Sequence, residues 1–170
     1  FQTAILEWLL TGDQLFDLLH CHDHMTGLIS FLIKHSQAYK NLKETGFFTI
    51  NHIFEDIIED AHHTSAKYPE EISEFDMTNL KEEYKGNYKA PFVKGSPVQM
   101  SMKFVEEIHI PSNDVMLIVA QIEELYIKDV LLEKDGLVNL SKGNIATING
   151  LDTYAIPKFK KQLSYQRPKK

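Results

Sequence analysis

The stretch SFLIKHSQAYKNLKETGFFTINHIFEDIIEDAHHTS, residues 30–65, decides the fold that we expect for this 170-residue chain. Short apolar runs that alternate with helix-like patterns, separated by polar junctions, predict strand, helix, strand and helix in turn. We expect a strand over Leu28–Ile33, a helix over Gln37–Thr45, a strand over Phe47–Ile50, and a longer helix that ends at residues 62–65.

Two junction residues predict where the first helix begins and ends. Ser36 is of the type that accepts a hydrogen bond from the first turn of a helix, and Gly46 is of the type that ends one. Asn51 stands in the same position before the second helix and is a candidate N-cap there. Of that helix, the apolar residues Ile53, Phe54, Ile57, Ile58 and Ala61 would face the core, with Glu55, Asp56, Glu59 and Asp60 in solvent.

The same junctions are candidates for holding a phosphate. Lys34, His35 and Ser36 join the first strand to the first helix, and helix N-termini with their free N–H groups attract anions. The alternative is a solvated strand end followed by an ordinary N-cap. Thr64 and Ser65 follow the second helix, where hydroxyls commonly satisfy free carbonyl groups.

Composition narrows the class of protein. Apolar residues make up 43% and charged residues 25%, which are ordinary values for one globular domain, and we expect residues 1–170 to form a single domain. The net charge of −6 and a single arginine, Arg167, argue against nucleic acid. One cysteine, Cys21, excludes an internal disulfide and fits a reducing compartment, so we expect a cytoplasmic protein without membrane partners. Because Phe1 is no initiator, we expect the N-terminal segment to be incomplete.

The second half of the chain reads mostly as strand. Residues 67–94 are polar and form a long excursion, with a short helix expected near Thr78–Tyr84. Residues 97–110 and 115–127 predict a β-hairpin, with Val98, Met100, Met102 and Phe104 on one face. We expect a short strand at residues 137–140, a brief helix capped by Ser141, and a basic tail over 158–170. The predicted class is therefore mostly β with flanking helices (α+β).

Four segments in order resemble the flavin reductase-like family, whose fold is an FMN-binding split β-barrel. They are KHSQAYKNLKETGFFTIN, AHHTSAKYPEEISEF, KAPFVKGSPVQMSMKFVEE and GLDTYAI, and the similarity spans about residues 28–154. The family's early flavin-contact strand would fall near residues 3–8. There TAILEWLL departs from the family pattern, with Glu7 and Trp8 where small hydroxyl residues are expected.

The resemblance implies a flavoprotein that binds FMN without a covalent bond, usually as a homodimer with the site near the subunit interface. It implies electron or hydride transfer from a reduced donor such as NAD(P)H, with no catalytic side chain identified. Its motifs, carried to this sequence, give the expected cofactor-binding residues Lys34, His35, Ser36, Asn41, Asn51, Thr64 and Ser65. In the same reading Tyr154 lies near the flavin; otherwise it packs on the barrel end.

Two other readings stay open. The same barrel could serve as a non-enzymatic flavin-binding or protein-interaction module. His20, His22 and His24 would share one face of a strand and could bind a transition metal, although the more common reading is a polar loop. The sequence contains no GxGxxG segment, so it offers no Rossmann nicotinamide site.

Overall fold

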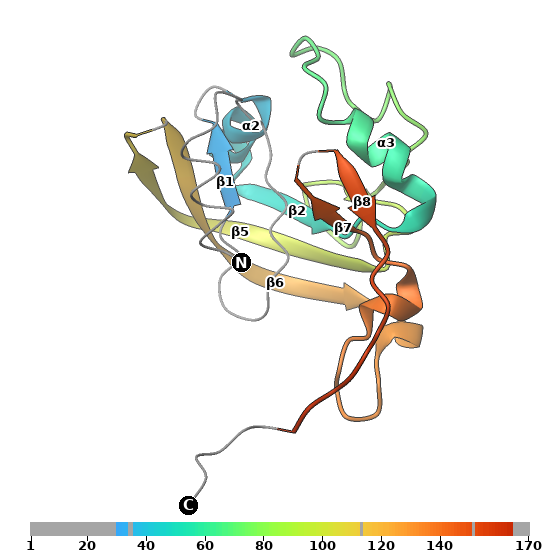
Figure 1. The fold of residues 1–170 in the computed structure, drawn as a ribbon. Coiled ribbons are helices and arrows are strands. Elements are labelled where there is room, and N and C mark those ends of the chain that lie inside the picture. The colour runs from blue at the N-terminus through green and yellow to red at the C-terminus, as the bar shows by residue number, and fades with distance from the viewer. Residues whose placement is uncertain (1–29, 34–35, 113, 151, 165–170) are drawn as a thin grey trace, which may run out of the picture.

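The computed structural model describes residues 30–33, 36–112, 114–150 and 152–164. Their centre is a four-stranded antiparallel sheet in the order β1-β6-β5-β2 (Figure 1). The strands are β1 (Ser30–Ile33), β2 (Phe47–Asn51), β5 (Val98–Ile110) and β6 (Val115–Ile127). The fold is mostly β with a few helices, as predicted.

The predicted hairpin is confirmed as β5 and β6. Its pairing runs from Ile110 opposite Val115 at the turn to Val98 opposite Ile127 at the open end. The register shifts twice, between Ser101 and Met102 and again after Phe104. Such bulges bend a strand and increase its twist, so a ribbon of this length can curve around a core.

The core lies on one face of this ribbon. Val98, Met100 and Met102 are buried in one apolar cluster, as predicted, and Phe104 packs against a second cluster formed with α2. Gln99 and Ser101 point to the other face and are buried too. The first half of β5 is therefore covered on both faces, which a one-sided pattern does not predict.

The structure confirms both predicted ends of the first helix. Helix α2 spans Gln37–Thr45, with the Oγ of Ser36 accepting the N–H of Tyr39 at 3.2 Å. Gly46 ends the helix with φ of 74°, a left-handed conformation that glycine adopts without a steric penalty. Its N–H donates to the carbonyl of Leu42 at 2.8 Å, and Leu42 is buried in the second apolar cluster with Met116 and Ile118.

The prediction that Asn51 caps the second helix is wrong. Asn51 pairs with Gln99 as the last residue of β2, and the next N–H, of His52, donates to the carbonyl of Val98. The chain is therefore still strand-like at this point. The helical segment starts later, as a 3₁₀ turn η1 (Glu55–Ile57) followed by α3 (Ile58–His63), and it ends where predicted.

The helix predicted near Thr78–Tyr84 is also wrong. The excursion instead contains β3 (Glu82–Glu83), which pairs with β4 (Phe92–Val93) in a small antiparallel sheet. Gly86, with φ of 53°, helps to turn the chain between them. The hydroxyl of Tyr88 donates a hydrogen bond of 2.6 Å to the carbonyl oxygen of Met102, and this bond joins the excursion to β5.

The predicted strand over residues 137–140 is wrong as well. Only Val138 forms a β-bridge, to Leu132, and Leu140 already begins the 3₁₀ helix η3 (Leu140–Gly143). The N-cap position of η3 is Asn139 rather than Ser141. The remaining elements, which the sequence did not predict as such, are η2 (Asp129–Leu131), β7 (Thr147–Asn149) and β8 (Thr153–Ala155).

Candidate functional site

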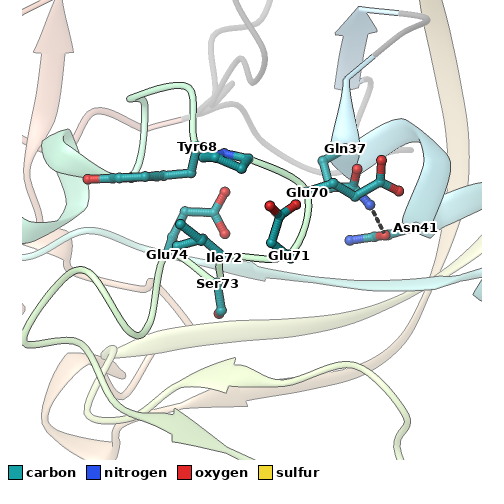
Figure 2. Close-up of a pocket in the computed structure, with 9 residues that line it drawn as sticks. Gln37, Asn41, Tyr68, Glu70, Glu71, Ile72, Ser73 and Glu74 are labelled. Carbon is teal, nitrogen blue, oxygen red and sulfur yellow. Dashed lines mark hydrogen bonds between the residues drawn. The ribbon is translucent and has the colours of Figure 1, made fainter.

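A cleft of about 270 Å³ lies between the first turns of α2 and the loop at residues 68–74 (Figure 2). Gln37 and Asn41, one helical turn apart, form the helix side and are joined by a hydrogen bond of 2.8 Å. The loop side carries the acidic-aromatic segment that follows Thr64 and Ser65. The residues lining the cleft are Gln37, Asn41, Tyr68, Pro69, Glu70, Glu71, Ile72, Ser73 and Glu74.

The cleft is acidic on its loop side. Glu70, Glu71 and Glu74 all line it. Among the described residues, Glu70 alone of the three has an ion pair, with the Nζ of Lys40 at 2.9 Å. That hydrogen bond and the lysine charge lower the pKa of Glu70 below its ordinary value. Carboxylates repel a phosphate, so an anion is disfavoured between them, whereas hydroxyl groups could bind these acceptors.

Ser36 provides the contrasting environment at the helix start. It is buried, and no acidic residue occupies the first turn of α2. Gln37 and Ala38 belong to the turn whose N–H groups find no acceptor within a helix. These N–H groups and the positive end of the helix dipole suit an anion. Gln37 also borders the cleft, so the helix start and the cleft are neighbours.

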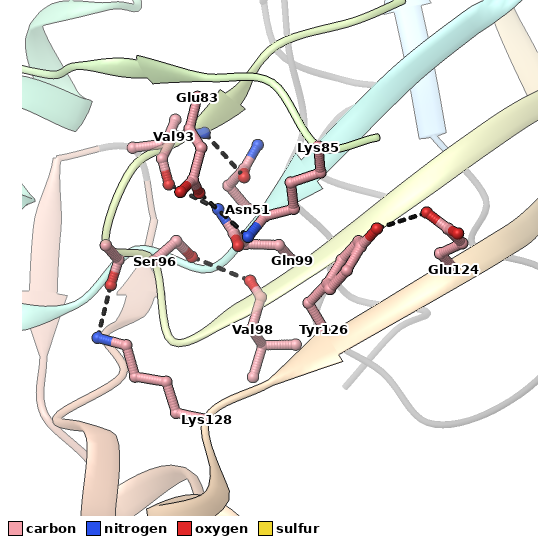
Figure 3. Close-up of polar contacts among 11 residues, drawn as sticks. Asn51, Glu83, Lys85, Val93, Ser96, Val98, Gln99, Glu124, Tyr126 and Lys128 are labelled. Carbon is pink, nitrogen blue, oxygen red and sulfur yellow. Dashed lines mark hydrogen bonds and ion pairs between the residues drawn. The ribbon is translucent and has the colours of Figure 1, made fainter. Parts of the chain in front are cut away.

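Asn51 lies at the end of β2 away from α2 and does not line the cleft (Figure 3). Its Nδ2 donates to the Oγ1 of Thr49 at 3.0 Å, and its Oδ1 accepts the N–H of Val93 at 3.0 Å. Thr49 in turn donates to the carbonyl of Pro91 at 2.6 Å. The amide thus joins β2 to the β3–β4 excursion.

Thr64 and Ser65 satisfy free carbonyls at the end of α3. The Oγ1 of Thr64 donates to Ala61 and the Oγ of Ser65 donates to His62, each at 2.7 Å. This is the structural role that the sequence allowed for them. His62 also lies 3.1 Å from the hydroxyl of Tyr154, a contact between α3 and β8 that the sequence did not reveal.

Several predicted residues lie outside the described part of the chain. They include Lys34 and His35 from the phosphate hypothesis, and the metal candidates His20, His22 and His24. The expected strand near residues 3–8 lies there too. Among the described residues, no group of three His, Cys, Asp or Glu side chains could hold a metal ion. None of the described helices is long and apolar enough to cross a membrane.

The structure therefore brings Asn41 of α2 to the loop that follows Thr64 and Ser65. Ser36 caps the same helix without lining the cleft, and Asn51 lies elsewhere on the sheet. Sequence reasoning missed the lining residues Gln37 and Tyr68. The segment AHHTSAKYPEEISEF did signal this loop as a family motif. Its contact with α2, through Lys40 and Glu70, could not be foreseen from spacing.

The fold agrees with the comparisons to known proteins. The flavin reductase like domain matches residues 23–144. A flavin-reductase-type protein with a split-barrel domain from Shewanella frigidimarina NCIMB 400 is 32% identical, with a TM-score of 0.76 over 88% of this chain and 76% of that one. An FMN-binding protein from Thermus thermophilus is 14% identical, with a TM-score of 0.66 over 82% and 78%, and supports the fold alone.

Two curated relatives are matched over parts of their length. The chain is 27% identical over 103 residues, 61% of its length, to an uncharacterized protein of Aquifex aeolicus, of which it spans 52%. It is 46% identical over 44 residues, 26% of its length, to a glycogen synthase of Flavobacterium johnsoniae, of which it spans 9%. The family match covers most of the chain, and the chain belongs to the flavin reductase-like family.

Proposed function

We propose that this protein binds FMN and passes electrons or hydride from a reduced donor, such as NAD(P)H, to a second substrate. The observation that carries the proposal is the capped N-terminus of α2 beside the cleft. It offers free N–H groups for a phosphate next to a space that suits a hydroxyl-bearing chain. Bound FMN would supply the redox chemistry, and the protein would supply position and surroundings.

The residue roles in this proposal follow from local chemistry. The first-turn N–H groups after Ser36 would bind the phosphate, with Lys34 and His35 adding positive charge. Asn41 and the carboxylates of the loop would accept hydrogen bonds from the ribityl hydroxyls. Asn51, Thr64 and Ser65 remain proposed FMN contacts. Because their side chains already form hydrogen bonds within the fold, they would contact FMN through backbone groups or after a change of side-chain conformation.

We also propose that the protein acts in the cytoplasm as a homodimer. Pockets that bury a cofactor usually measure about 300–1,000 Å³, and the cleft of about 270 Å³ is below that range. A second copy could complete the site. Exposed apolar side chains on β5, Val105 and Ile108, offer surface for such an association.

The test is reconstitution of the purified chain with FMN, followed by addition of NADH or NADPH without oxygen. The proposal predicts that the protein retains flavin absorption after desalting and that the absorption bleaches with the donor. A protein that retains no flavin contradicts the proposal. Oligomeric state should be measured with and without FMN, because a site completed by a second copy predicts tighter association when FMN is bound.

Two observations favour a second function. The side chains of Asn51, Thr64 and Ser65 are all engaged in bonds that hold the fold, and the cleft is acidic. These features suit a non-enzymatic flavin-binding or interaction module on the same barrel. Such a module would bind FMN without donor-dependent bleaching, or would bind none, so the same experiment separates it from the enzyme.

A further inference from the structure

The loop over residues 66–78, which forms one wall of the cleft, has both of its ends on α3. It begins directly after the end of that helix. At its other end, Asp60 of α3 accepts hydrogen bonds from the backbone N–H of Asn79 at 3.0 Å and from its Nδ2 at 3.2 Å. Leu80 follows and is buried. A compact surface loop whose two ends are held together in this way is an Ω-loop, and such loops frequently carry function.

Between these ends the loop has no anchor in the core. No residue from 66 to 78 is buried. In the described structure, every backbone hydrogen bond of residues 67–78 closes a turn within the loop, as from the N–H of Ile72 to Pro69 and from the N–H of Asp76 to Ser73. A segment with little buried surface and only local hydrogen bonds opens at a small cost in free energy.

Among the described residues, side-chain contacts on two sides join the loop to its neighbours. On the α3 side, the hydroxyl of Tyr68 lies 2.5 Å from the Nε2 of His63. On the α2 side, the Nζ of Lys40 donates to the Oε2 of Glu70 at 2.9 Å. This bond and the lysine charge lower the pKa of Glu70, and a hydrogen bond from Gln37 adds to the effect. Figure 2 shows Glu70 beside Gln37, with the ring of Tyr68 directed away from them.

We propose that residues 66–78 form a lid over the cleft, hinged on α3 and latched to α2 by the ion pair between Lys40 and Glu70. Their side chains are 48% and 62% exposed, and an ion pair this exposed is weak enough to open and close while the sheet stays intact. Opening would give a ligand access to Gln37 and Asn41. The inference rests on the proposed function, in which carboxylates of the loop bind the ribityl hydroxyls, so bound FMN would favour the closed lid.

The distance between two spin labels measures the position of the lid without any ligand. In a Cys21→Ser background, the labels are attached at Glu44→Cys on α2 and at Asp76→Cys on the loop. Both replace exposed carboxylates that form no ion pair with any described residue. The proposal predicts a closed and an open population. Glu70→Gln should lower the ratio of closed to open roughly two- to fivefold, and Lys40→Glu should lower it as well.

Exchanging the two charges provides the matched control. Lys40→Glu combined with Glu70→Lys should restore the ratio of the unsubstituted chain. Glu71→Gln removes a charge from the same loop without breaking an ion pair among the described residues, and it should leave the ratio unchanged. The same distances in Glu70→Gln as in the unsubstituted chain would overturn the proposal, and so would an equal shift in Glu71→Gln.

Adding FMN tests the role of the lid in binding. Saturating FMN should raise the closed fraction of the labelled chain that carries no latch substitution. An unchanged ratio at full occupancy would overturn the assignment of the loop as a lid for this ligand. A chain that binds no FMN would contradict the proposed function, whereas the distances measured without ligand would still decide whether the loop is latched by Lys40 and Glu70.

Discussion

The Oδ1 of Asn51 accepts a hydrogen bond from the N–H of Val93 at 3.0 Å, although 42 residues separate the two along the chain. The bond joins the end of β2 to β4, and the side chain of Gln99 donates to the carbonyl of the same Val93 at 2.8 Å. Two amide side chains thus hold both backbone groups of one residue in the excursion. Because both backbone groups of Val93 are hydrogen-bonded, the excursion can cover the polar face of the sheet without burying unsatisfied groups.

Removing this amide should destabilise the fold. Asn51→Ala leaves the Val93 N–H without its acceptor in a partly buried position, and we expect the free energy of unfolding to fall by about 1–3 kcal/mol. Asn41→Ala is the control, because the exposed Asn41 side chain accepts one surface hydrogen bond from Gln37 and its loss should change stability by less than about 0.5 kcal/mol. Urea unfolding of both variants makes the comparison. Equal losses would contradict the role assigned to Asn51.

The hydroxyl of Tyr88 should stabilise the same excursion. It lies 2.6 Å from the carbonyl of Met102 and 3.1 Å from that of Phe48, and burial raises the pKa of Tyr88. We expect Tyr88→Phe to cost about 1 kcal/mol in thermal or urea unfolding. Tyr84→Phe, at an exposed tyrosine of the same excursion, should cost nearly nothing. A larger loss at Tyr84 would contradict this view of the excursion.

Gly143 allows the close packing of η3 on the core. A Cβ at this position would lie 2.7 Å from the Cδ2 of Leu131, a fully buried side chain. We expect Gly143→Ala to reduce the unfolding free energy by about 1–3 kcal/mol through overpacking. The double variant with Leu131→Ala should lose less than the sum of the two single losses, because the smaller side chain makes room. Additive losses would show that the contact is not the cause.

The ion pair between Lys40 and Glu70 should give the cleft a weak dependence on pH. The pKa of Glu70 is lowered in the folded protein, chiefly by its hydrogen bond with Lys40. Stability from this pair is therefore present above the ordinary carboxyl pKa and is lost as the pH falls through the lowered value. Glu70→Gln should be slightly less stable than wild type at neutral pH, and the difference should disappear as the pH falls below the lowered pKa of Glu70. Urea unfolding of wild type and Glu70→Gln over this pH range measures the difference.

Local signals in the sequence were sufficient for part of the fold. Ser36 and Gly46 act within one helical turn, so cap and stop could be predicted, and the apolar runs around residue 112 predicted the hairpin. Asn51 was misassigned because an asparagine suits both a helix cap and a strand end. The hydrogen bond from the N–H of Val93, 42 residues further along the chain, holds Asn51 as a strand end. Residues 78–84 were misassigned for a similar reason, since β3 exists only through its pairing with β4.

The candidate site, like the fold, could be predicted from the sequence only in part. The proposed phosphate site at the start of α2 follows from Ser36 and the chain around it. The cleft needs α2 and the loop at residues 68–74 to meet, and the ion pair between Lys40 and Glu70 joins them across 30 residues. No pattern within either segment predicts that contact. The acidic lining of the site therefore became visible only in the structure.

The most direct test of the central claim compares FMN with riboflavin, which lacks the phosphate, by calorimetric titration into the purified chain. A phosphate held at the start of α2 predicts that FMN binds at least about tenfold more tightly than riboflavin, with the gap reduced at high salt. Equal affinities, or binding of neither ligand, would contradict the account.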